Sequence, residues 1–213
     1  MPSNIEGLEG ARNRILQLLS ESPSRVLIGI VGKPGAGKST VTSKLKELLP
    51  KENVTVLSQD GYHLSNSQLA SLNRADRKGA PDTFDPKGFS ELLDRVSKDL
   101  TNEIYFPIFH REIEESIAAE GVITPQTKVV LVEGNYLLLD SFGWQEVSKF
   151  LHEKWYLLVD DELRLKRLVA RHIEFGKSPE FAHAWAHGTD EKNAKLIEST
   201  QHRADANLLV YSD

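Results

Sequence analysis

The chain has 213 residues, of which 39% are hydrophobic and 27% are charged, and it carries a formal net charge of −5 with no cysteine. This composition suits a single α/β domain over residues 1–213, and it excludes disulfides and thiolate metal sites. No apolar run approaches the roughly 20 residues of a membrane span, and the first residues lack the order of a signal peptide. We therefore expect a cytoplasmic protein that binds neither membranes nor nucleic acid.

Apolar periodicity in the first half of the chain predicts helices that alternate with short strands. The polar stretch over 61–87 is irregular, and loops of that length are usually functional or disordered. The elements expected in this half are a leading helix over 5–19, a buried strand over 26–31, a helix beginning near residue 38, a short strand over 54–57, a helix over 89–96 and an extended piece over 104–106 that Pro107 stops.

The second half continues the alternation. Its expected elements are strands over 128–133, 155–159 and 207–211, a basic helix that begins near Asp161, and a helix that carries His183 and His187. Because no acidic motif partners the two histidines, we do not predict a metal site there. Strands that alternate with helices predict an α/β fold in which a parallel β-sheet is sandwiched by helices.

Residues 32–40 read Gly-Lys-Pro-Gly-Ala-Gly-Lys-Ser-Thr, a phosphate-loop pattern that follows a buried strand and opens a helix. The glycines let the backbone curl around a phosphate, and the N–H groups at the helix start attract the anion. Lys38 is expected to reach the β- and γ-phosphates of ATP, and the Ser39 hydroxyl to ligate Mg²⁺. The residues predicted to bind the nucleotide are Gly32, Lys33, Pro34, Gly35, Ala36, Gly37, Lys38, Ser39 and Thr40.

Two acidic residues stand at the ends of other predicted strands. Glu133 follows four apolar residues, the Walker B pattern, and is expected to hold Mg²⁺ directly or through water. Asp60 is the candidate general base that would take the proton of an attacking hydroxyl. The structural alternatives are a helix-capping or loop-bonding acid for Glu133 and a turn residue before Gly61 for Asp60. Ligands bind beyond the carboxyl ends of parallel strands, which favours the functional interpretation of both acids.

Two segments of the first half carry cations near the expected site. Arg77 and Lys78 lie in the long polar loop, where a solvated surface and a cationic rim around a substrate are equally consistent with the sequence. Phe109 and Arg111 end an aromatic run that belongs either to the core or to a segment closing over a substrate.

A third group of cations follows on the basic helix, where Arg164, Arg167 and Arg171 share one face. Most such stripes are solvated faces, but in a phosphoryl-transfer enzyme they can form a lid that neutralises the phosphates. Lys177, in the next turn, could assist them.

These motifs, in this order, resemble the uridine kinase / phosphoribulokinase / bacterial pantothenate kinase superfamily, and most closely its nucleoside-kinase-like or fructokinase-like branch. The resemblance spans about residues 25–211. It rests on the phosphate loop, on the Gln-Asp-Gly-Tyr-His stretch over 59–63, on the Arg-Lys-Gly-Ala-Pro-Asp-Thr-Phe-Asp stretch over 77–85, on the Val-Glu-Gly-Asn-Tyr stretch over 132–136 and on the arginine-rich helix.

The resemblance implies a P-loop NTPase fold with Asp60 as the base and with Arg167 and Arg171 in a lid over 161–180. It also implies that residues 60–111 form the acceptor-binding region. The residues assigned to the acceptor site are Tyr62, His63, Arg77, Lys78, Phe84, Asp85, Phe109, Arg111, Asn135 and Tyr136. Uridine kinases usually carry Asp-Ser-Phe-Tyr where this chain has Asp-Gly-Tyr-His over 60–63, and the Asp-Gly pair is nearer the pantothenate kinase form.

We therefore expect a kinase that uses ATP and Mg²⁺ to phosphorylate a hydroxyl of a small metabolite. A sugar such as fructose and a nucleoside are both open, because residues 60–111 offer polar groups for a sugar and aromatic rings for a base. The alternatives are a pantothenate-like acceptor, or a regulatory NTPase that transfers phosphate to water. The Asn-Lys-x-Asp guanine motif of GTPases is absent from the sequence. A homodimer also stays open.

Overall fold

The computed structural model describes residues 2–22 and 24–210. Its helices are α1 (Gly7–Glu21), α2 (Lys38–Leu48), α3 (Asn66–Ser71), α4 (Pro86–Lys98), α5 (Asp161–Glu174), α6 (Pro179–His187) and α7 (Thr189–Glu198). Its strands are β1 (Ser3–Glu6), β2 (Val26–Val31), β3 (Val54–Ser58), β4 (Ile104–His110), β5 (Glu115–Ile123), β6 (Val129–Gly134), β7 (Glu153–Leu158) and β8 (Ala206–Leu209). Among these helices, none is long and apolar enough to cross a membrane.

The described strands form a six-stranded sheet in the order β1-β8-β7-β2-β6-β3, in which every neighbouring pair is parallel. All residues of β2 and β6 are buried, as expected for central strands covered on both faces. In the register, Val31 pairs with Gly134, and Ser58 pairs with Glu133. The carboxyl ends of β2, β3 and β6 therefore lie side by side, and the segments that follow them meet at one edge of the sheet.

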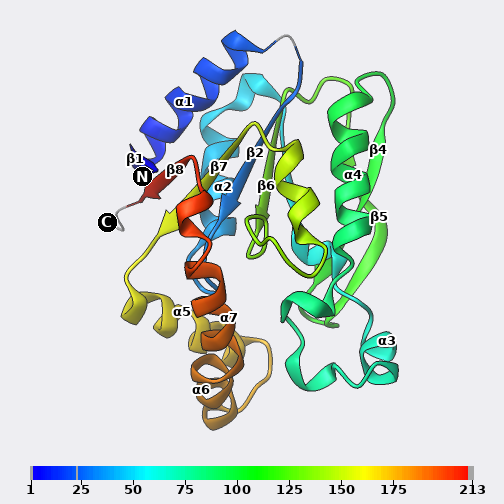
Figure 1. The fold of residues 1–213 in the computed structure, drawn as a ribbon, viewed down its shortest axis with the longest axis vertical. Coiled ribbons are helices and arrows are strands. Elements are labelled where there is room, and N and C mark those ends of the chain that lie inside the picture. Colours follow the sequence, from blue (N-terminus) through cyan, green and yellow to red (C-terminus); the bar gives the residue numbers. More distant parts are fainter. Residues whose placement is uncertain (1, 23, 211–213) are drawn as a thin grey trace.

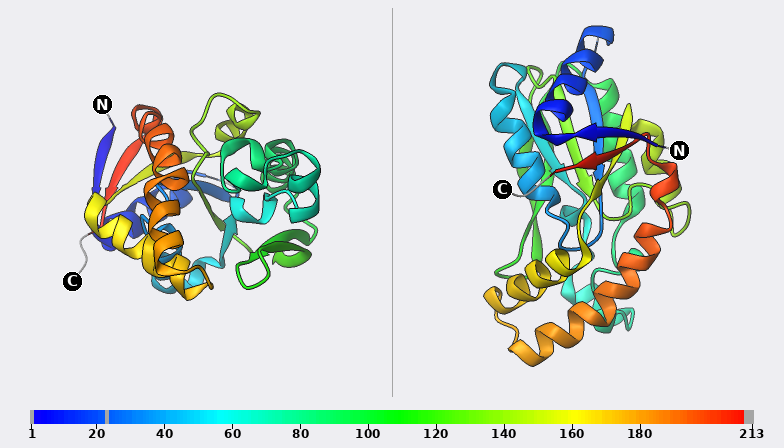
Figure 2. Two further views of the ribbon diagram at one scale, coloured as in Figure 1. Left: turned by 90° about the horizontal axis from the view of Figure 1, so that it is seen from below. Right: turned by 90° about the vertical axis from the view of Figure 1, so that its left-hand side faces the viewer.

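Helices cover both faces of the sheet (Figures 1 and 2), which confirms the predicted α/β class. Alternate side chains of β2 divide between the two cores. Ile28 and Ile30 join the cluster under α1 and α2. Leu27 and Val31 join the cluster under α4, which also includes the segment 136–151 and Ile197 of α7.

Two further units stand beyond this framework. The antiparallel ribbon of β4 and β5 lies beside α4 (Figure 1). Within the ribbon, the Phe106 ring covers Gly121. Helices α5, α6 and α7 extend past the carboxyl ends of the strands. In the view from below, they and the segment around α3 lie to either side of the strand ends (Figure 2).

The N-terminal prediction was wrong in one respect. Residues 3–6 form β1 rather than the first turn of the leading helix, and Ile5 pairs with Leu208 of β8. The helix starts at Gly7, whose φ of +68° ends the strand. The apolar spacing of the segment fits a helix, but a four-residue edge strand is specified by its distant partner, which a local pattern does not reveal.

The prediction around Pro107 was also wrong, because β4 continues through the proline to His110. The register shifts between Phe106 and Ile108, so the residue without an N–H sits at an irregularity of the ladder. The following strand β5 was not predicted. Residues 61–87, expected to be irregular, contain α3 and short 3-10 turns. At the other end of the chain, β8 stops at Leu209, and Tyr211 of the predicted last strand lies outside the described residues.

Candidate active site

The phosphate loop joins β2 to α2, and its shape depends on two glycines. Gly35 and Gly37 have φ angles of +81° and +91°, in the left-handed region that side chains disfavour. A Cβ on Gly35 would also lie 2.6 Å from the carbonyl oxygen of Arg164 in α5. The loop thus curls tightly and ends at the start of a helix, which is the geometry that cradles a phosphate.

Lys38, the first residue of α2, folds back over this loop. Its Nζ donates to the Gly32 carbonyl oxygen at 2.9 Å and to Asn135 Oδ1 at 2.5 Å. Burial lowers the pKa of Lys38 to about 8, against the opposing charges of Glu133 and Asp60. Neutral oxygen atoms therefore hold the ammonium group at the mouth of the loop. A phosphate oxygen bound there would take their place as a charged acceptor.

Glu133 is the penultimate residue of β6 and contacts the first turns of α2. Its Oε1 accepts a hydrogen bond from Ser39 Oγ at 2.9 Å, and its Oε2 accepts one from Thr42 Oγ1 at 3.0 Å. Burial and the charge of Asp60 raise the pKa of Glu133, against the opposing effect of Lys38. The two predicted Mg²⁺ ligands, Ser39 and Glu133, are therefore in contact.

This pair fits a magnesium ion that is held in part by phosphate and water. Within residues 2–22 and 24–210, no group of three or more His, Cys, Asp or Glu side chains is arranged to hold a metal. Magnesium on a nucleotide keeps several waters and needs only one or two protein oxygens besides the phosphates. A hydroxyl and a carboxylate beside the phosphate loop meet that requirement.

Asp60 lies in the 3-10 helix Gln59–Tyr62, which follows β3. Its Oδ2 accepts a hydrogen bond from Arg111 Nη2 at 3.0 Å. Gly61 lies against the Pro107 carbonyl, so this turn packs directly on the ribbon that carries Arg111. Burial alone raises the pKa of Asp60, but the charges of His63 and Arg111 and the weaker one of Lys38 hold the pKa below its ordinary value. The carboxylate is therefore ionised at neutral pH and can accept a proton.

Two cavities meet at Asp60. We call the first, of about 440 Å³, the loop cavity, because the phosphate loop, Glu133 and Arg167 line it. We call the second, of about 310 Å³, the outer cavity; it lies between the 60–111 region and helices α5, α6 and α7. The residues that line both are Pro34, Asp60, Arg111, Asn135, Arg171 and Phe175. A nucleotide in the loop cavity and an acceptor in the outer cavity would share this boundary.

Six of the ten predicted acceptor residues line the outer cavity. They are His63, Lys78, Phe84, Phe109, Arg111 and Asn135. The His63 ring packs between Phe84 and Phe109, with ring centroids 4.0 and 4.6 Å away. Burial lowers the pKa of His63, against the opposing charge of Asp60.

The other four predicted acceptor residues lie outside the lining of both cavities and support the wall from behind. Tyr62 packs on Phe89, and burial raises its pKa to about 12. Asp85 caps α4 by accepting a hydrogen bond from the Gly88 N–H at 2.9 Å. The Tyr136 hydroxyl donates to the Gly79 carbonyl at 2.6 Å.

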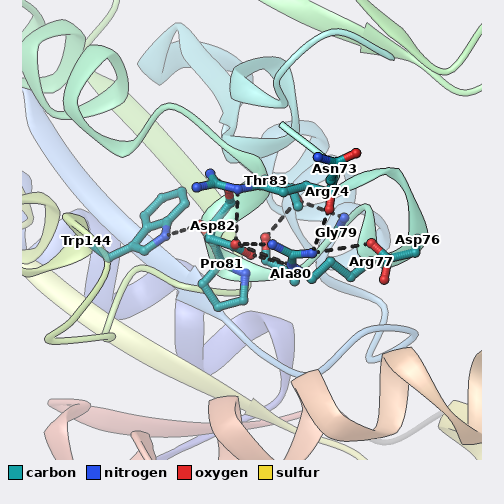
Figure 3. A network of polar contacts seen from close by, with 10 residues as sticks. All are labelled: Asn73, Arg74, Asp76, Arg77, Gly79, Ala80, Pro81, Asp82, Thr83 and Trp144. Atoms are coloured by element: carbon teal, nitrogen blue, oxygen red, sulfur yellow. Dashed lines mark hydrogen bonds and ion pairs between the residues drawn. The ribbon is translucent and has the colours of Figure 1, made fainter. Parts of the chain in front are cut away.

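Arg77, the fourth, belongs to a polar network that holds the loop over 73–83 (Figure 3). Its Nη2 donates to Asp82 Oδ2 at 2.9 Å, and Arg74 forms a second ion pair with the same carboxylate. Trp144 Nε1 donates to the Pro81 carbonyl at 3.1 Å. The Arg77 side chain therefore stabilises the loop itself, whereas its neighbour Lys78 lines the outer cavity.

The three arginines of the α5 stripe have different surroundings. Arg167 and Arg171 line the loop cavity. Arg164 is fully buried and binds Glu191 at 2.6 Å, Asp161 at 2.8 Å and the Pro34 carbonyl at 3.4 Å. It therefore ties the phosphate loop to α5 and α7 rather than facing a ligand.

The Lys33 side chain, within the predicted nucleotide loop, likewise turns to α5, where its Nζ lies 2.6 Å from Asp161. The loop can therefore use only the backbone of this residue to hold a phosphate.

One wall of the outer cavity was not predicted from any sequence motif. This wall comprises Glu114, His172, Phe175, Phe181, Trp185, Asp190 and Asn193. Most of it comes from α6 and α7, where no recognised motif stands, and only the fold brings these helices opposite the 60–111 region. His183 and His187 stack on each other at 4.0 Å and do not line the cavity.

Comparison with known proteins agrees with the parallel α/β fold. The model of the phosphoribulokinase / uridine kinase family matches residues 27–213. A provisionally named uridine kinase of Schizosaccharomyces pombe is 33% identical over 181 residues, which cover 81% of this chain and 77% of that protein. A pantothenate kinase of Lactococcus lactis is 27% identical over 228 residues, covering 95% and 74% of the two chains.

Solved structures extend the likeness. A provisionally named fructose transport system kinase from Silicibacter sp. TM1040 superposes with a TM-score of 0.85 and 33% identity, covering 96% of this chain and 98% of that chain. YFH7 from Saccharomyces cerevisiae, at 17% identity and a TM-score of 0.83, covers 97% and 99% and shares the fold.

Proposed function

Because the chain belongs to the phosphoribulokinase / uridine kinase family of P-loop kinases, we propose that it transfers the γ-phosphoryl group of ATP to a hydroxyl of a small metabolite held in the outer cavity. One observation carries the proposal. Asp60, ionised and held by Arg111, stands where the loop cavity and the outer cavity meet. A general base in that place has a nucleotide phosphate on one side and an acceptor hydroxyl on the other.

The loop cavity would hold the nucleotide. The backbone N–H groups of the phosphate loop and the Lys38 ammonium bind phosphate oxygens, and Ser39 and Glu133 hold the magnesium ion. Bound magnesium supplies neutralisation of the phosphate charge. Thr42 keeps the Glu133 carboxylate oriented through its hydrogen bond to Oε2. The protein contributes mainly positioning and electrostatic stabilisation, as phosphoryl transfer requires.

The transfer itself would take place at the shared boundary. Asp60 accepts the proton of the acceptor hydroxyl as its oxygen forms the new bond to phosphorus, and the bond from phosphorus to the bridging oxygen of ADP breaks. Arg111 keeps Asp60 ionised and oriented before the proton moves. Arg167 and Arg171, carried by α5, stabilise the negative charge on the transferring group.

The acceptor is a small hydroxylated metabolite, and the sequence motifs place a sugar such as fructose and a nucleoside first, with a pantothenate-like compound as the alternative. A regulatory NTPase would need no acceptor site. The outer cavity, lined by charged and aromatic side chains beside Asp60, favours the kinase over that reading.

A panel of hydroxylated metabolites, assayed with ATP and Mg²⁺ for ADP release, tests the proposal. We expect at least one compound to stimulate ADP release strongly. In the variant Asp60→Asn, ATP binding should persist while turnover falls roughly 10²–10⁴-fold. An undiminished rate in this variant would remove Asp60 from the role of base, and ADP release that no metabolite affects would favour the regulatory NTPase.

A further inference from the structure

We propose that the acceptor carries an anionic group, a carboxylate or a phosphate, and that Lys177 binds it. The inference rests on the proposed function and narrows it, because it places hydroxy acids and sugar phosphates before neutral sugars and nucleosides. It starts from the charges that face the outer cavity. These are the cations Lys78, Arg111, Arg171 and Lys177 and the acids Asp60, Glu114 and Asp190.

Each of the three acids already has a partner in the cavity wall. Asp60 binds Arg111 at 3.0 Å, and Glu114 lies 3.3 Å from Lys78 Nζ. Asp190 Oδ2 lies 2.7 Å from His172 Nε2. Each acid is therefore already engaged by a side chain of the wall.

Two cations are left over. Within the part of the chain that the structure describes, neither Arg171 nor Lys177 forms a side-chain hydrogen bond or ion pair with another residue. Arg171 lines both cavities, and under the proposed function its charge faces the phosphates of the nucleotide. Lys177 lines the outer cavity alone, so its charge is available to the acceptor. A half-buried ammonium group with no counter-charge favours an anion from the ligand.

The backbone fixes where Lys177 points. Helix α5 ends at Glu174, and Gly176 follows in the left-handed region with a φ of +92°. The Lys177 N–H then donates to the His172 carbonyl at 3.0 Å, which closes the turn in the manner of a glycine C-cap. The side chain returns over α6, with Nζ 5.8 Å from the centre of the Trp185 ring. The aromatic face supports the ammonium group without neutralising it.

The aromatic rings of the opposite wall do not provide a slot for a base. His63 stands between Phe84 and Phe109 at centroid distances of 4.0 and 4.6 Å, which are already those of rings in contact. Lys78 Nζ and Arg111 Cζ lie 5.3 and 6.0 Å from the centre of the Phe109 ring. This wall therefore presents cations on an aromatic support, which suits an anion better than a stacked nucleobase.

Matched acceptors that differ only in charge test the inference. Suitable pairs are D-glycerate with glycerol and pantothenate with pantothenyl alcohol for a carboxylate, and D-ribulose 5-phosphate with D-ribulose for a phosphate. Fructose and uridine complete the panel as neutral acceptors. We expect kcat/KM for the preferred charged compound to exceed that of its neutral partner and of fructose and uridine by roughly 10- to 100-fold, the value of one charge-assisted hydrogen bond. A neutral compound that matches or exceeds the charged ones overturns the inference.

The variant Lys177→Gln assigns the effect to this residue. It should raise KM for the charged acceptor roughly 10- to 100-fold with a much smaller fall in kcat, and it should abolish the preference over the neutral partner. Lys177→Arg should retain the preference. Lys166→Gln, which removes an exposed charge from α5 outside both cavities, should behave as the parent. A preference that survives Lys177→Gln overturns the role of Lys177.

The inference and the proposed function fail in different ways. If no compound of the panel is phosphorylated, the kinase proposal fails. Titration calorimetry of the same pairs, without ATP, then decides the inference by itself. Tighter binding of a charged member than of its neutral partner, lost in Lys177→Gln, supports it, and equal or absent binding contradicts it.

Discussion

The loop cavity and the outer cavity meet at Asp60, yet they are built in different ways. The loop cavity is made largely from one continuous stretch, residues 32–40, and from the ends of two neighbouring strands. The outer cavity collects side chains from the 60–111 region, the β4–β5 turn and helices α5 to α7. A local, backbone-based site is specified by a short motif, whereas a site assembled from distant side chains is specified only by the fold. Under the proposed function, the loop cavity would bind the phosphate donor, and the outer cavity would select the acceptor.

The largest effect that separates the two cavities is expected at Lys38. Lys38→Met removes the ammonium group that would bind the transferring phosphate and should lower kcat by roughly 10²–10³-fold for every acceptor alike. Steady-state kinetics with two acceptors measures this. Lys44→Met, an exposed residue of the same helix, is the matched control. A loss that differs between acceptors would contradict a role for Lys38 that is confined to the phosphate donor.

The next effect concerns Arg164, which connects the phosphate loop to α5 and α7. Arg164→Met leaves Glu191 and Asp161 without their buried partner and should lower the free energy of unfolding by about 2–4 kcal/mol. It should also weaken ATP binding, because Arg164 contacts the Pro34 carbonyl of the phosphate loop. Chemical denaturation and nucleotide titration measure both effects, with Lys166→Met as the control on the same helix. Unchanged stability would show that α5 does not depend on this contact.

A smaller effect is expected behind the outer cavity. Tyr136→Phe removes the hydroxyl that donates to the Gly79 carbonyl and should cost about 1 kcal/mol of stability. Because Gly79 lies in the wall of the outer cavity, KM for the acceptor should rise while KM for ATP stays nearly constant. Tyr105→Phe, at an exposed position of β4, is the matched control. An equal rise in both KM values would contradict the separation of the two sites.

The smallest effect is a pH dependence in the loop of Figure 3. The Arg77 hydrogen bond, against the effect of burial, holds the pKa of Asp82 below its ordinary value. Because the folded-state pKa is the lower one, this stabilisation is present above the unfolded pKa, about 4, and is lost as the pH falls through the folded value. Arg77→Met should therefore melt below the parent at roughly pH 7 and approach it at about pH 3.

Thermal melts of the two proteins across this range measure the difference. Arg95→Met, an exposed arginine of α4, should show no such convergence. A constant gap between parent and Arg77→Met would exclude the Asp82 pair as its cause.

The same contrast explains what the sequence could predict. The buried strands, the phosphate loop and the acids at positions 60 and 133 follow from apolar runs and strand-end motifs, and the structure brings them to one edge of the sheet. Trp185, Asp190 and Asn193 carry no motif, and their place in the wall of the outer cavity depends on how α6 and α7 pack. Arg77 is the opposite case. It belongs to a sequence motif, but its side chain binds Asp82 within the same loop and does not line either cavity.

Under the proposed function, a phosphoryl group passes from a nucleotide in the loop cavity to a metabolite in the outer cavity. The direct measurement is the molar ratio of phosphorylated acceptor to ADP, followed by phosphorus NMR with the compound that stimulates turnover most. We expect one phosphorylated acceptor for each ADP and little inorganic phosphate. Equal amounts of ADP and inorganic phosphate, with the acceptor unchanged, would contradict it.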